Sequence, residues 1–368
     1  MPKAYIVAAT RTAGGRKGGQ LSGWHPVDLA AQVLDELVRR AGADPEQIDD
    51  VIMGCVSQIG EQSTNVARGA VLASSLPETV PATSVDRQCG SSQQALQFAA
   101  QAVMSGTMDC VIAAGVESMS RVPIGTPMDL PQKVGLGFYK SPLMEERYPD
   151  VFFSQFTGAE MVCQNWNLSR EEMDRFSLES HQKAAAATKA GKFADEIVPV
   201  EQRLHDGSVP GSMARTDEGI RYDASYEAIS QVRLLHEGGR LTAASASQIC
   251  DGAAGLMVVS EKGLKDLGVE PMARIHHLSV TGGDPVVMLD TPIAATQRAL
   301  VKAGMTIDDI DLYEVNEAFA SIPMAWMKGV DADPSRLNVH GGAIALGHPL
   351  GGSGAKLMVT LIHALNCL

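Results

Sequence analysis

Residues 27–52 read VDLAAQVLDELVRRAGADPEQIDDVI, and residues 291–312 read TPIAATQRALVKAGMTIDDIDL. Both stretches combine apolar residues at helical spacing, a glycine that ends the helix, a short acidic turn and a strand-like apolar run. The two glycines, Gly42 and Gly304, lie 262 residues apart. This shared layout predicts two copies of one helix–turn–strand unit, with ordinary recurrence of βα units as the alternative explanation.

A second pair of segments repeats at the same spacing. The position 262 residues after Cys89 is Gly351, and residues 90–92 fall on residues 352–354. Both runs continue into segments rich in Ala, Leu and Val that we expect to be helices. We therefore predict an α/β fold with a duplicated, layered core in which helices cover mainly parallel or mixed sheets.

The repeats set the expected domain boundaries. One half covers residues 1–118 together with roughly 249–272, and the other half covers residues 273–368. Residues 119–248 differ from both, because they combine prolines, helical runs and polar turns. We expect this insertion to form a loop domain packed over the core, where such segments often carry ligand contacts.

The composition limits the class of protein. The chain has 368 residues, 45% of them hydrophobic, and a formal net charge of −13, which argues against nucleic-acid binding. No run approaches the roughly 18 apolar residues of a membrane span, and the first residues do not resemble a signal peptide. The six cysteines include no CxxC pair, so we expect no metal site and reduced thiols in a cytoplasmic compartment.

Cys89 is the first candidate for chemistry. It stands in VDRQCGSSQQAL, residues 85–96, where an extended run meets the predicted helix. A helix N-terminus carries roughly +0.5 of an elementary charge and can lower a cysteine pKa from about 8.5 to between about 3.5 and 7.5. The placement favours a nucleophilic thiolate; the alternative is a buried structural cysteine, which describes most free cysteines.

His348 is the second candidate. It lies in NVHGGAIALGHPLGGSG, residues 338–354, at the entry to the helix that matches the Cys89 helix. If the two helix N-termini face one another, a Cys/His pair for an activated thiol results. The alternative is a glycine-rich loop with a hydrogen-bonded structural histidine. The stretch matches neither the phosphate-loop pattern nor a dinucleotide fingerprint.

Two further polar segments lie at the ends of expected strands. Asn316 comes after an expected strand over residues 312–315, where it either holds a water or carbonyl oxygen or caps a helix. Residues 242–255 are small and polar, and we expect them to line a ligand and lead into a buried strand. Within them Asp251 is expected to cap or turn the chain.

In these stretches the sequence resembles the thiolase family of acyl-CoA acetyltransferases, over essentially its whole length. The motifs stand in family order in residues 87–91, 245–254, 316–319 and 341–349. The resemblance implies a thiolase-like duplicated αβαβα core with an inserted loop domain, assembled as a homodimer or homotetramer. It also implies acyl-CoA substrates, with coenzyme A and acetyl-CoA used as substrates and no permanently bound cofactor.

The resemblance implies a role for each candidate residue. Cys89 is acylated, His348 activates it, and Asn316 orients a water that forms an oxyanion hole with the histidine. Arg221 and Ser247 contact the nucleotide or pantetheine arm of coenzyme A. The implied reaction is thiolytic cleavage of a 3-ketoacyl-CoA, or the reverse Claisen condensation, through an acyl-Cys89 intermediate.

Two positions bear on the substrate. Phe156 stands where biosynthetic acetoacetyl-CoA thiolases have a histidine, and His340 stands where an asparagine is usual. Both favour a degradative 3-ketoacyl-CoA thiolase for longer or bulkier chains.

Thiolases carry a second catalytic cysteine in a Cys-x-Gly loop after the last helix. The repeat spacing puts the counterpart of Cys110 beyond Leu368, and Cys367 is too close to His348 to replace that cysteine. We therefore expect the second half to lack its closing strand and the chain to be a shortened version of a longer protein. A catalytically impaired acyl-CoA-binding or scaffold homologue and a ketosynthase-like condensing enzyme are the alternatives.

Overall fold

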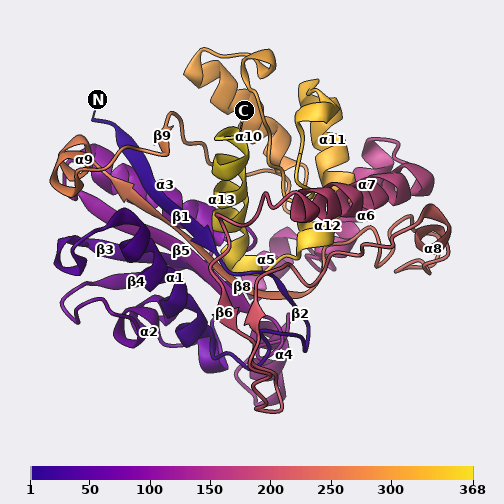
Figure 1. Cartoon of the computed structure of the whole chain (residues 1–368). Helices are drawn as coiled ribbons and strands as arrows, with labels where there is room; N and C mark the ends of the chain where they lie inside the picture. The colour runs from indigo at the N-terminus through magenta and orange to yellow at the C-terminus, as the bar shows by residue number, and fades with distance from the viewer. Residues whose placement is uncertain (1, 368) are drawn as a thin grey trace.

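The computed structural model describes residues 2–367 and is built on one seven-stranded sheet (Figure 1). The strand order is β4-β3-β5-β8-β1-β9, and the short β2 pairs with β8. β3 runs parallel to β4 and β5, whereas β8 runs antiparallel to β5 and β1. The sheet is therefore mixed, as predicted. The strands are β1 (Ala4–Arg11), β2 (Gly15–Arg16), β3 (Asp50–Gly54), β4 (Ala82–Val85), β5 (Cys110–Ser118), β8 (Cys250–Val259) and β9 (Ala273–Ile275).

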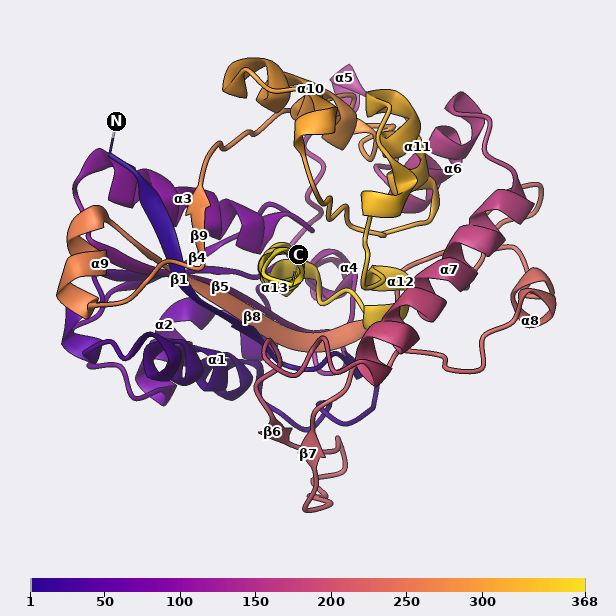
Figure 2. The same ribbon diagram turned by 45° about the horizontal axis from the view of Figure 1, so that its top comes forward.

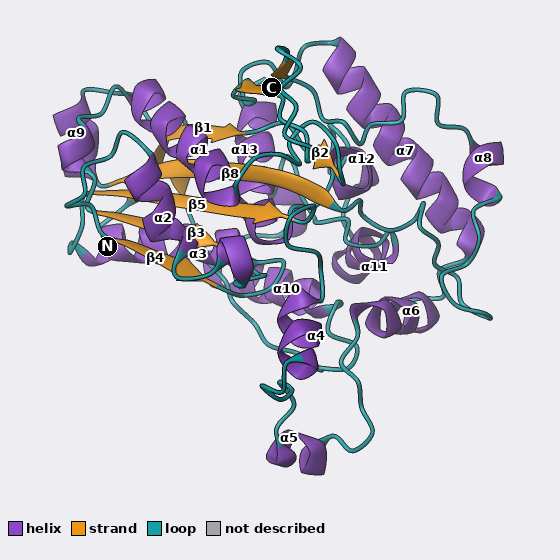
Figure 3. Ribbon diagram, turned by 90° about the horizontal axis from the view of Figure 1, so that it is seen from below, coloured by secondary structure: helices purple, strands orange, loops and turns teal. Residues whose placement is uncertain are grey.

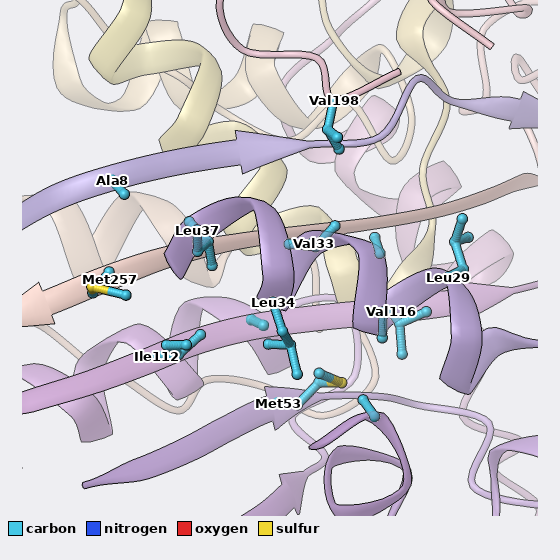
Figure 4. Packing of buried hydrophobic residues seen from close by; sticks show 14 of the residues in the cluster. Ala8, Leu29, Val33, Leu34, Leu37, Met53, Ile112, Val116, Val198 and Met257 are labelled. Atoms are coloured by element: carbon cyan, nitrogen blue, oxygen red, sulfur yellow. The ribbon is translucent and has the colours of Figure 1, made fainter. Parts of the chain in front are cut away.

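Helices cover both faces of this sheet (Figure 2). α1 (Pro26–Ala41) and α2 (Val66–Ala73) pack on one face, and α3 (Ser91–Ser105) and α13 (Ser353–Leu365) pack on the other. Successive side chains of β5 alternate between these two cores, because neighbouring residues of a strand point to opposite faces. Figure 4 shows the first core, in which Leu34 and Leu37 of α1 lie over Ile112 of β5 and Met257 of β8.

The duplication is visible in the helices of the two halves. α10 (Thr291–Ala303) ends, like α1, at a glycine in the left-handed conformation: φ is 60° at Gly42 and 68° at Gly304. A short 3-10 turn follows each glycine, η1 (Pro45–Gln47) and η3 (Ile307–Asp309). α13, from the C-terminal half, packs on the sheet of the N-terminal half, so the two halves share one core. The α/β fold class is confirmed.

The strand expected over residues 312–315 is reduced to a single bridge. Tyr313 N–H donates to Arg336 O at 2.9 Å, and Asn338 N–H donates to Tyr313 O at 2.9 Å. The next rung is made by a side chain, because Asn338 Nδ2 donates to Val315 O and Asn338 Oδ1 accepts from Val315 N–H, both at 2.9 Å. Because the Asn338 side chain occupies the backbone N–H and C=O of Val315, no further strand pairing follows the bridge at Tyr313. The expected absence of a closing strand concerns chain beyond Leu368, outside the described residues.

Residues 119–248 hold helices and one two-stranded hairpin over the core. α4 and α5 project away from the sheet in Figure 3. Buried Arg11 of β1 ties the insertion to the core, with Nε 2.6 Å from Glu196 Oε1 and Nη1 2.7 Å from Asp217 Oδ1. The insertion's elements are α4 (Thr126–Lys133), α5 (Pro142–Arg147), α6 (Gln155–Asn165), α7 (Arg170–Lys189), β6 (Val200–Glu201), β7 (Met213–Ala214) and α8 (Tyr226–Ser230).

The remaining elements are short helices and turns of the two halves. They are η2 (Gly60–Gln62), α9 (Glu261–Leu267), α11 (Ser321–Val330), η4 (Pro334–Arg336), α12 (Ala343–Leu346) and η5 (Leu350–Gly352). Across residues 2–367, every helix is too short or too polar to cross a membrane. The domain boundaries given above stay a prediction.

Candidate active site

Cys89 lies in a tight turn between β4 and α3. Gln88, just before it, has a φ of +48°, a left-handed conformation that is uncommon for a residue with a side chain. Gly90 N–H donates to Arg87 O, and Ser91 N–H donates to Gln88 O, both at 3.0 Å. The Ser91 hydroxyl closes the turn by accepting from Arg87 N–H at 2.9 Å and donating to Gln88 O at 2.6 Å. The cysteine therefore stands at the strand–helix junction that the sequence predicts.

The protonation state of Cys89 differs from the expectation. The residue is half-buried, and burial raises the pKa of its thiol to about 11, with smaller contributions from the charges of Glu117 and Asp86. The expected lowering of this pKa is wrong, because burial, with two nearby carboxylates adding to it, raises the pKa more than a backbone hydrogen bond lowers it. Cys89 is thus a neutral thiol at pH 7, and the nucleophilic role expected of it would require a base.

The N-terminal turns of α3 and α13 pack against one another. Ala355 N–H of α13 donates to Ser92 Oγ of α3 at 2.8 Å. A Cβ atom at Gly354 would lie 2.3 Å from Gln93 N, so only glycine allows this approach. The pseudo-symmetric meeting of the two helix ends is as predicted, and each of the two candidate residues, the cysteine and the histidine, stands just before one of these turns.

One buried carboxylate joins the two sides of this meeting point. Glu117, on β5, accepts from Gly351 N–H at 2.9 Å and from Val56 and Ser57 N–H at 2.9 and 3.0 Å. It also accepts from Gln62 Nε2 at 2.7 Å. Charge-assisted bonds of this kind are among the stronger ones in proteins, so Glu117 fixes the entry to α13 against the core of the first half.

His348 is buried and held in one tautomer. Its Nδ1 contacts Ser353 Oγ, whose own proton goes to Pro349 O at 3.0 Å. Because that hydroxyl can only accept from the ring, Nδ1 carries the proton and Nε2 keeps its lone pair. Burial lowers the pKa of His348 to about 4, helped by the charge of Lys356. The imidazole is therefore neutral at pH 7, and Nε2 is the ring nitrogen that keeps a lone pair.

Asn316 touches this histidine directly. Its Nδ2 lies 3.4 Å from His348 Nε2, and its Oδ1 is buried without a hydrogen-bond partner among residues 2–367. Asn316, Ser353 and Lys356 are among the residues that line a narrow cavity beside it, which is mostly apolar and has a volume of about 20 Å³, enough for one water molecule. The alternative role as a helix cap is wrong, because α11 begins only at Ser321.

Asp251 is not the turn residue that the sequence suggested. It lies within β8, fully buried, and its carboxylate accepts from Ser120 N–H at 2.8 Å and from Ser120 Oγ at 2.6 Å. Burial raises the pKa of Asp251. The residue anchors the start of the insertion to the sheet. The buried strand expected after residues 242–255 begins earlier, at Cys250, inside that stretch.

The two residues expected at coenzyme A lie in different settings, and only Arg221 lines a pocket directly. Arg221 is exposed and lines a pocket of about 410 Å³ together with Arg16, Tyr222 and Gln248. Ser247 is half-buried beside that pocket, and its N–H donates to a backbone carbonyl of the segment after Asn316 at 3.0 Å.

Sequence reasoning missed two polar residues of this region. Ser353 could have been found from the repeat, because it lies 262 residues after Ser91. The hydroxyl of each serine donates to a backbone carbonyl of the turn before its helix. Nothing in the sequence distinguishes Gln248 from the other residues of the small polar stretch 242–255. Its backbone carbonyl accepts from His348 N–H at 3.1 Å, and its side chain lines the Arg221 pocket.

Comparison with known proteins gives consistent matches over the whole length. The model of a thiolase N-terminal domain matches residues 4–262, and that of a thiolase C-terminal domain matches residues 269–367. The chain is 51% identical over 371 residues to the steroid 3-ketoacyl-CoA thiolase of Mycobacterium tuberculosis, covering 100% of this chain and 88% of the relative.

Two further relatives match at lower identity. An acetyl-CoA acetyltransferase of Chromobacterium violaceum is 41% identical over 98% of this chain and 92% of its own length. A 3-ketoacyl-CoA thiolase of Bacillus subtilis is 39% identical over 100% of this chain and 93% of its own length.

Proposed function

We propose, since this chain belongs to the thiolase family, that it is an acyl-CoA acyltransferase that carries the acyl group on Cys89. The observation that carries this proposal is the packing of the α3 and α13 N-terminal turns, which brings the elements bearing Cys89 and His348 together. The neutral, Nδ1-protonated state of His348 supports its role as the base.

Acyl transfer from acetyl-CoA needs only these two side chains for its proton balance. His348 Nε2 takes the Cys89 thiol proton while the sulfur attacks the thioester carbonyl carbon. The carbon–sulfur bond to coenzyme A then breaks, and the departing thiolate takes the proton from His348. Burial disfavours either charge on its own, so proton transfer and attack occur together as negative charge passes to the thioester oxygen.

Asn316 and a water in the cavity beside it stabilise that oxygen. The buried, unpartnered Asn316 Oδ1 supports a water at this place, because such an atom needs a donor. The water then presents its second proton to the developing oxyanion.

Cleavage of a 3-ketoacyl-CoA follows the same course at a different carbon. The sulfur attacks the C3 ketone carbon, the C2–C3 bond breaks, and the acyl group stays on Cys89. The acetyl-CoA enolate that leaves takes up at C2 the proton that His348 received from the Cys89 thiol. Free coenzyme A then gives its thiol proton to His348 and attacks acyl-Cys89. The bond between the acyl carbon and the Cys89 sulfur breaks, and the departing Cys89 thiolate takes that proton back.

The Arg221 pocket is the proposed subsite for coenzyme A. An exposed guanidinium at its edge suits the phosphates of the nucleotide. Ser247, half-buried one residue before the pocket-lining Gln248, is placed for the pantetheine arm.

The aromatic side chains near Asn316 support a bulky acyl group. The Phe156 ring meets the Phe319 ring at 5.5 Å and the His236 ring at 6.4 Å between centroids, in edge-on geometry. Phe156 keeps 39% of its surface exposed, so this apolar wall is open to a ligand. The relative at 51% identity is named for steroid 3-ketoacyl-CoA, and we propose a bulky, ring-bearing acyl chain in degradative thiolysis.

Intact-mass measurement after exposure to acetyl-CoA tests the proposal. We expect one acetyl adduct per chain, lost in Cys89→Ala and removed by added coenzyme A. Binding of acetyl-CoA without an adduct would instead support an acyl-CoA-binding scaffold. Comparison of thiolysis rates for acetoacetyl-CoA and for ring-bearing 3-ketoacyl-CoA substrates then tests the acyl group.

A further inference from the structure

Gln248 connects the Arg221 pocket with the two catalytic segments. Its side chain lines the pocket, while its backbone carbonyl accepts from His348 N–H at 3.1 Å. The neighbouring Ser247 N–H donates to Ala318 O at 3.0 Å, on the segment that carries Asn316. Residues 247 and 248 are therefore bound to the loops of both His348 and Asn316.

The side-chain amide of Gln248 clamps two further loops. Nε2 donates one hydrogen to Gly219 O and the other to Ile344 O, both at 2.8 Å. Gly219 belongs to the wall of the Arg221 pocket, and Ile344 belongs to α12, four residues before His348. A shift of the pocket wall thus pulls on the loop that positions the base.

Gln248 Oε1 is the polar atom left for a ligand. Both amide hydrogens are used, and no donor among residues 2–367 reaches this oxygen. A Cβ at position 219 would lie 2.9 Å from Oε1, so the glycine there leaves the oxygen open on that side. The pantetheine arm of an acyl-CoA carries amide N–H groups, which are the donors that such an oxygen accepts.

We propose that Gln248 is a positioning residue that couples filling of the Arg221 pocket to the placement of His348. Its Oε1 accepts the amide N–H of the pantetheine arm that lies farther from the thioester, and its clamped Nε2 passes that contact to the pocket wall and the α12 loop. The inference rests on the proposed acyl transfer and adds that binding far from the thioester raises the rate at the thioester. Such coupling requires that the ligand bind the productive loop arrangement more tightly than the alternative.

The test compares a whole and a truncated acyl donor. Acetyl-CoA fills the pocket, whereas S-acetyl-N-acetylcysteamine carries the same thioester without the nucleotide and most of the arm. For wild type and Gln248→Ala, the saturating rate of acetyl-Cys89 formation is measured by rapid quench and intact mass. We expect Gln248→Ala to lower the acetyl-CoA rate by roughly tenfold, within the range typical of coupled sites, and the short donor's rate by less than about twofold.

Further variants separate coupling from simple damage. Gln248→Glu keeps an oxygen but loses both amide donors, so it should behave as Gln248→Ala does. In Arg221→Ala, which removes the proposed phosphate contact of the pocket, a second change at Gln248 should add little. Gln297→Ala is the matched control, because this exposed glutamine also donates to a backbone carbonyl, of Gly329, far from the pocket.

The outcomes are distinct. An equal fall for both donors, or no fall for either, overturns the role of Gln248 while the acetyl adduct in wild type preserves the proposed function. Absence of any adduct in wild type overturns the proposed function itself.

Discussion

α1 and α10 are matching helices with very different surroundings. α1 buries nine residues against the sheet and α2, whereas α10 buries none. Yet both have a proline in the first turn, both stop at a left-handed glycine, and both are followed by a 3-10 turn. The first half contributes six strands to the sheet, whereas among the described residues of the second half only the three-residue β9 joins it, and the segment after α10 makes a single bridge at Tyr313.

The contrast between the two halves shows which features depend on nearby residues alone and which depend on segments far away in the chain. A helix and its end are encoded within a few residues, because the hydrogen bonds and the capping glycine are local. A strand needs a partner, so the same pattern gives a strand only where another segment supplies the second row of donors and acceptors. The candidate site depends on both, because each helix end forms locally while the packing of α3 against α13 joins distant segments.

Replacing the cysteine at the first helix end should have the largest effect. Cys89→Ala removes the only atom proposed to carry the acyl group, so the acetyl adduct disappears completely. Mass spectrometry of the acetylated protein measures this directly. Cys367→Ser, which removes an exposed thiol near the end of the second half, should leave the adduct intact. An adduct that persists in Cys89→Ala and disappears in Cys367→Ser would reverse the assignment of the two halves.

The second-largest effect on the acylation rate should come from Asn316, whose side chain contacts His348. Asn316→Ala removes the proposed water-holding amide, and we expect a loss of about 10²–10³ in the acylation rate. Asn366→Ala, at the exposed C-terminal end of α13, is the control and should leave the rate unchanged. Equal rates for Asn316→Ala and wild type would remove Asn316 from the site.

The unequal packing of the two halves predicts unequal stability costs. Leu37→Ala in α1 truncates a fully buried side chain and should lower the free energy of unfolding by about 2–5 kcal/mol. Leu300→Ala in α10 truncates a half-buried one and should cost less than about 1.5 kcal/mol. Urea unfolding of both variants checks the ratio. Similar costs would mean that α10 is packed in solution as tightly as α1.

The burial of His348 predicts an unusual pH dependence. Its pKa is about 4 in the folded chain, against about 6.5 for a free imidazole, so the base stays neutral at pH 5. We expect the acid limb of the acylation rate near pH 4, and a rate at pH 5 roughly thirtyfold above that of a base with pKa 6.5. If the acylation rate instead falls with a midpoint near pH 6.5, His348 is exposed to solvent and the assignment of a buried base is wrong.

The same shift lowers stability in acid. Because the folded pKa lies below the unfolded one, the unfolded chain binds more protons between about pH 6.5 and pH 4, and unfolding becomes easier as the pH falls through that window. His181, whose pKa is also lowered to about 4 by burial and by the charge of Arg221, adds in the same direction. Unfolding midpoints recorded across pH 4–8 separate this loss from the kinetic limb.

The smallest effects should be equal in the two halves. Gly42→Ala and Gly304→Ala each force a Cβ into a left-handed residue, at a cost of about 1–2 kcal/mol, and no neighbouring atom lies within 4 Å of either Cβ. Urea unfolding should give the same loss for both, since the strain is local. A clear difference would show that packing also controls these helix ends.

Much of the site was predictable from residues alone. The repeat spacing of 262 placed Cys89 and His348 before matching helices, and the packing of those helix ends follows the predicted pseudo-symmetry. Asn316 was identified together with its alternative as a cap, which the start of α11 at Ser321 rules out. The role of Asp251 was missed, because burial within β8 and the bonds from Ser120 involve a distant segment.

By itself, the sequence determined the helices, their glycine ends, the two halves and the residue types that meet between them, because these depend on spacing and on local backbone preferences. Only the tertiary structure decided that the Cys89 thiol is neutral, that Ser353 fixes the tautomer of His348 and that Gln248 bonds both the wall of the Arg221 pocket and the His348 loop. Protonation states and clamping bonds depend on burial and on partners far away in the chain, and neither is encoded in any short stretch.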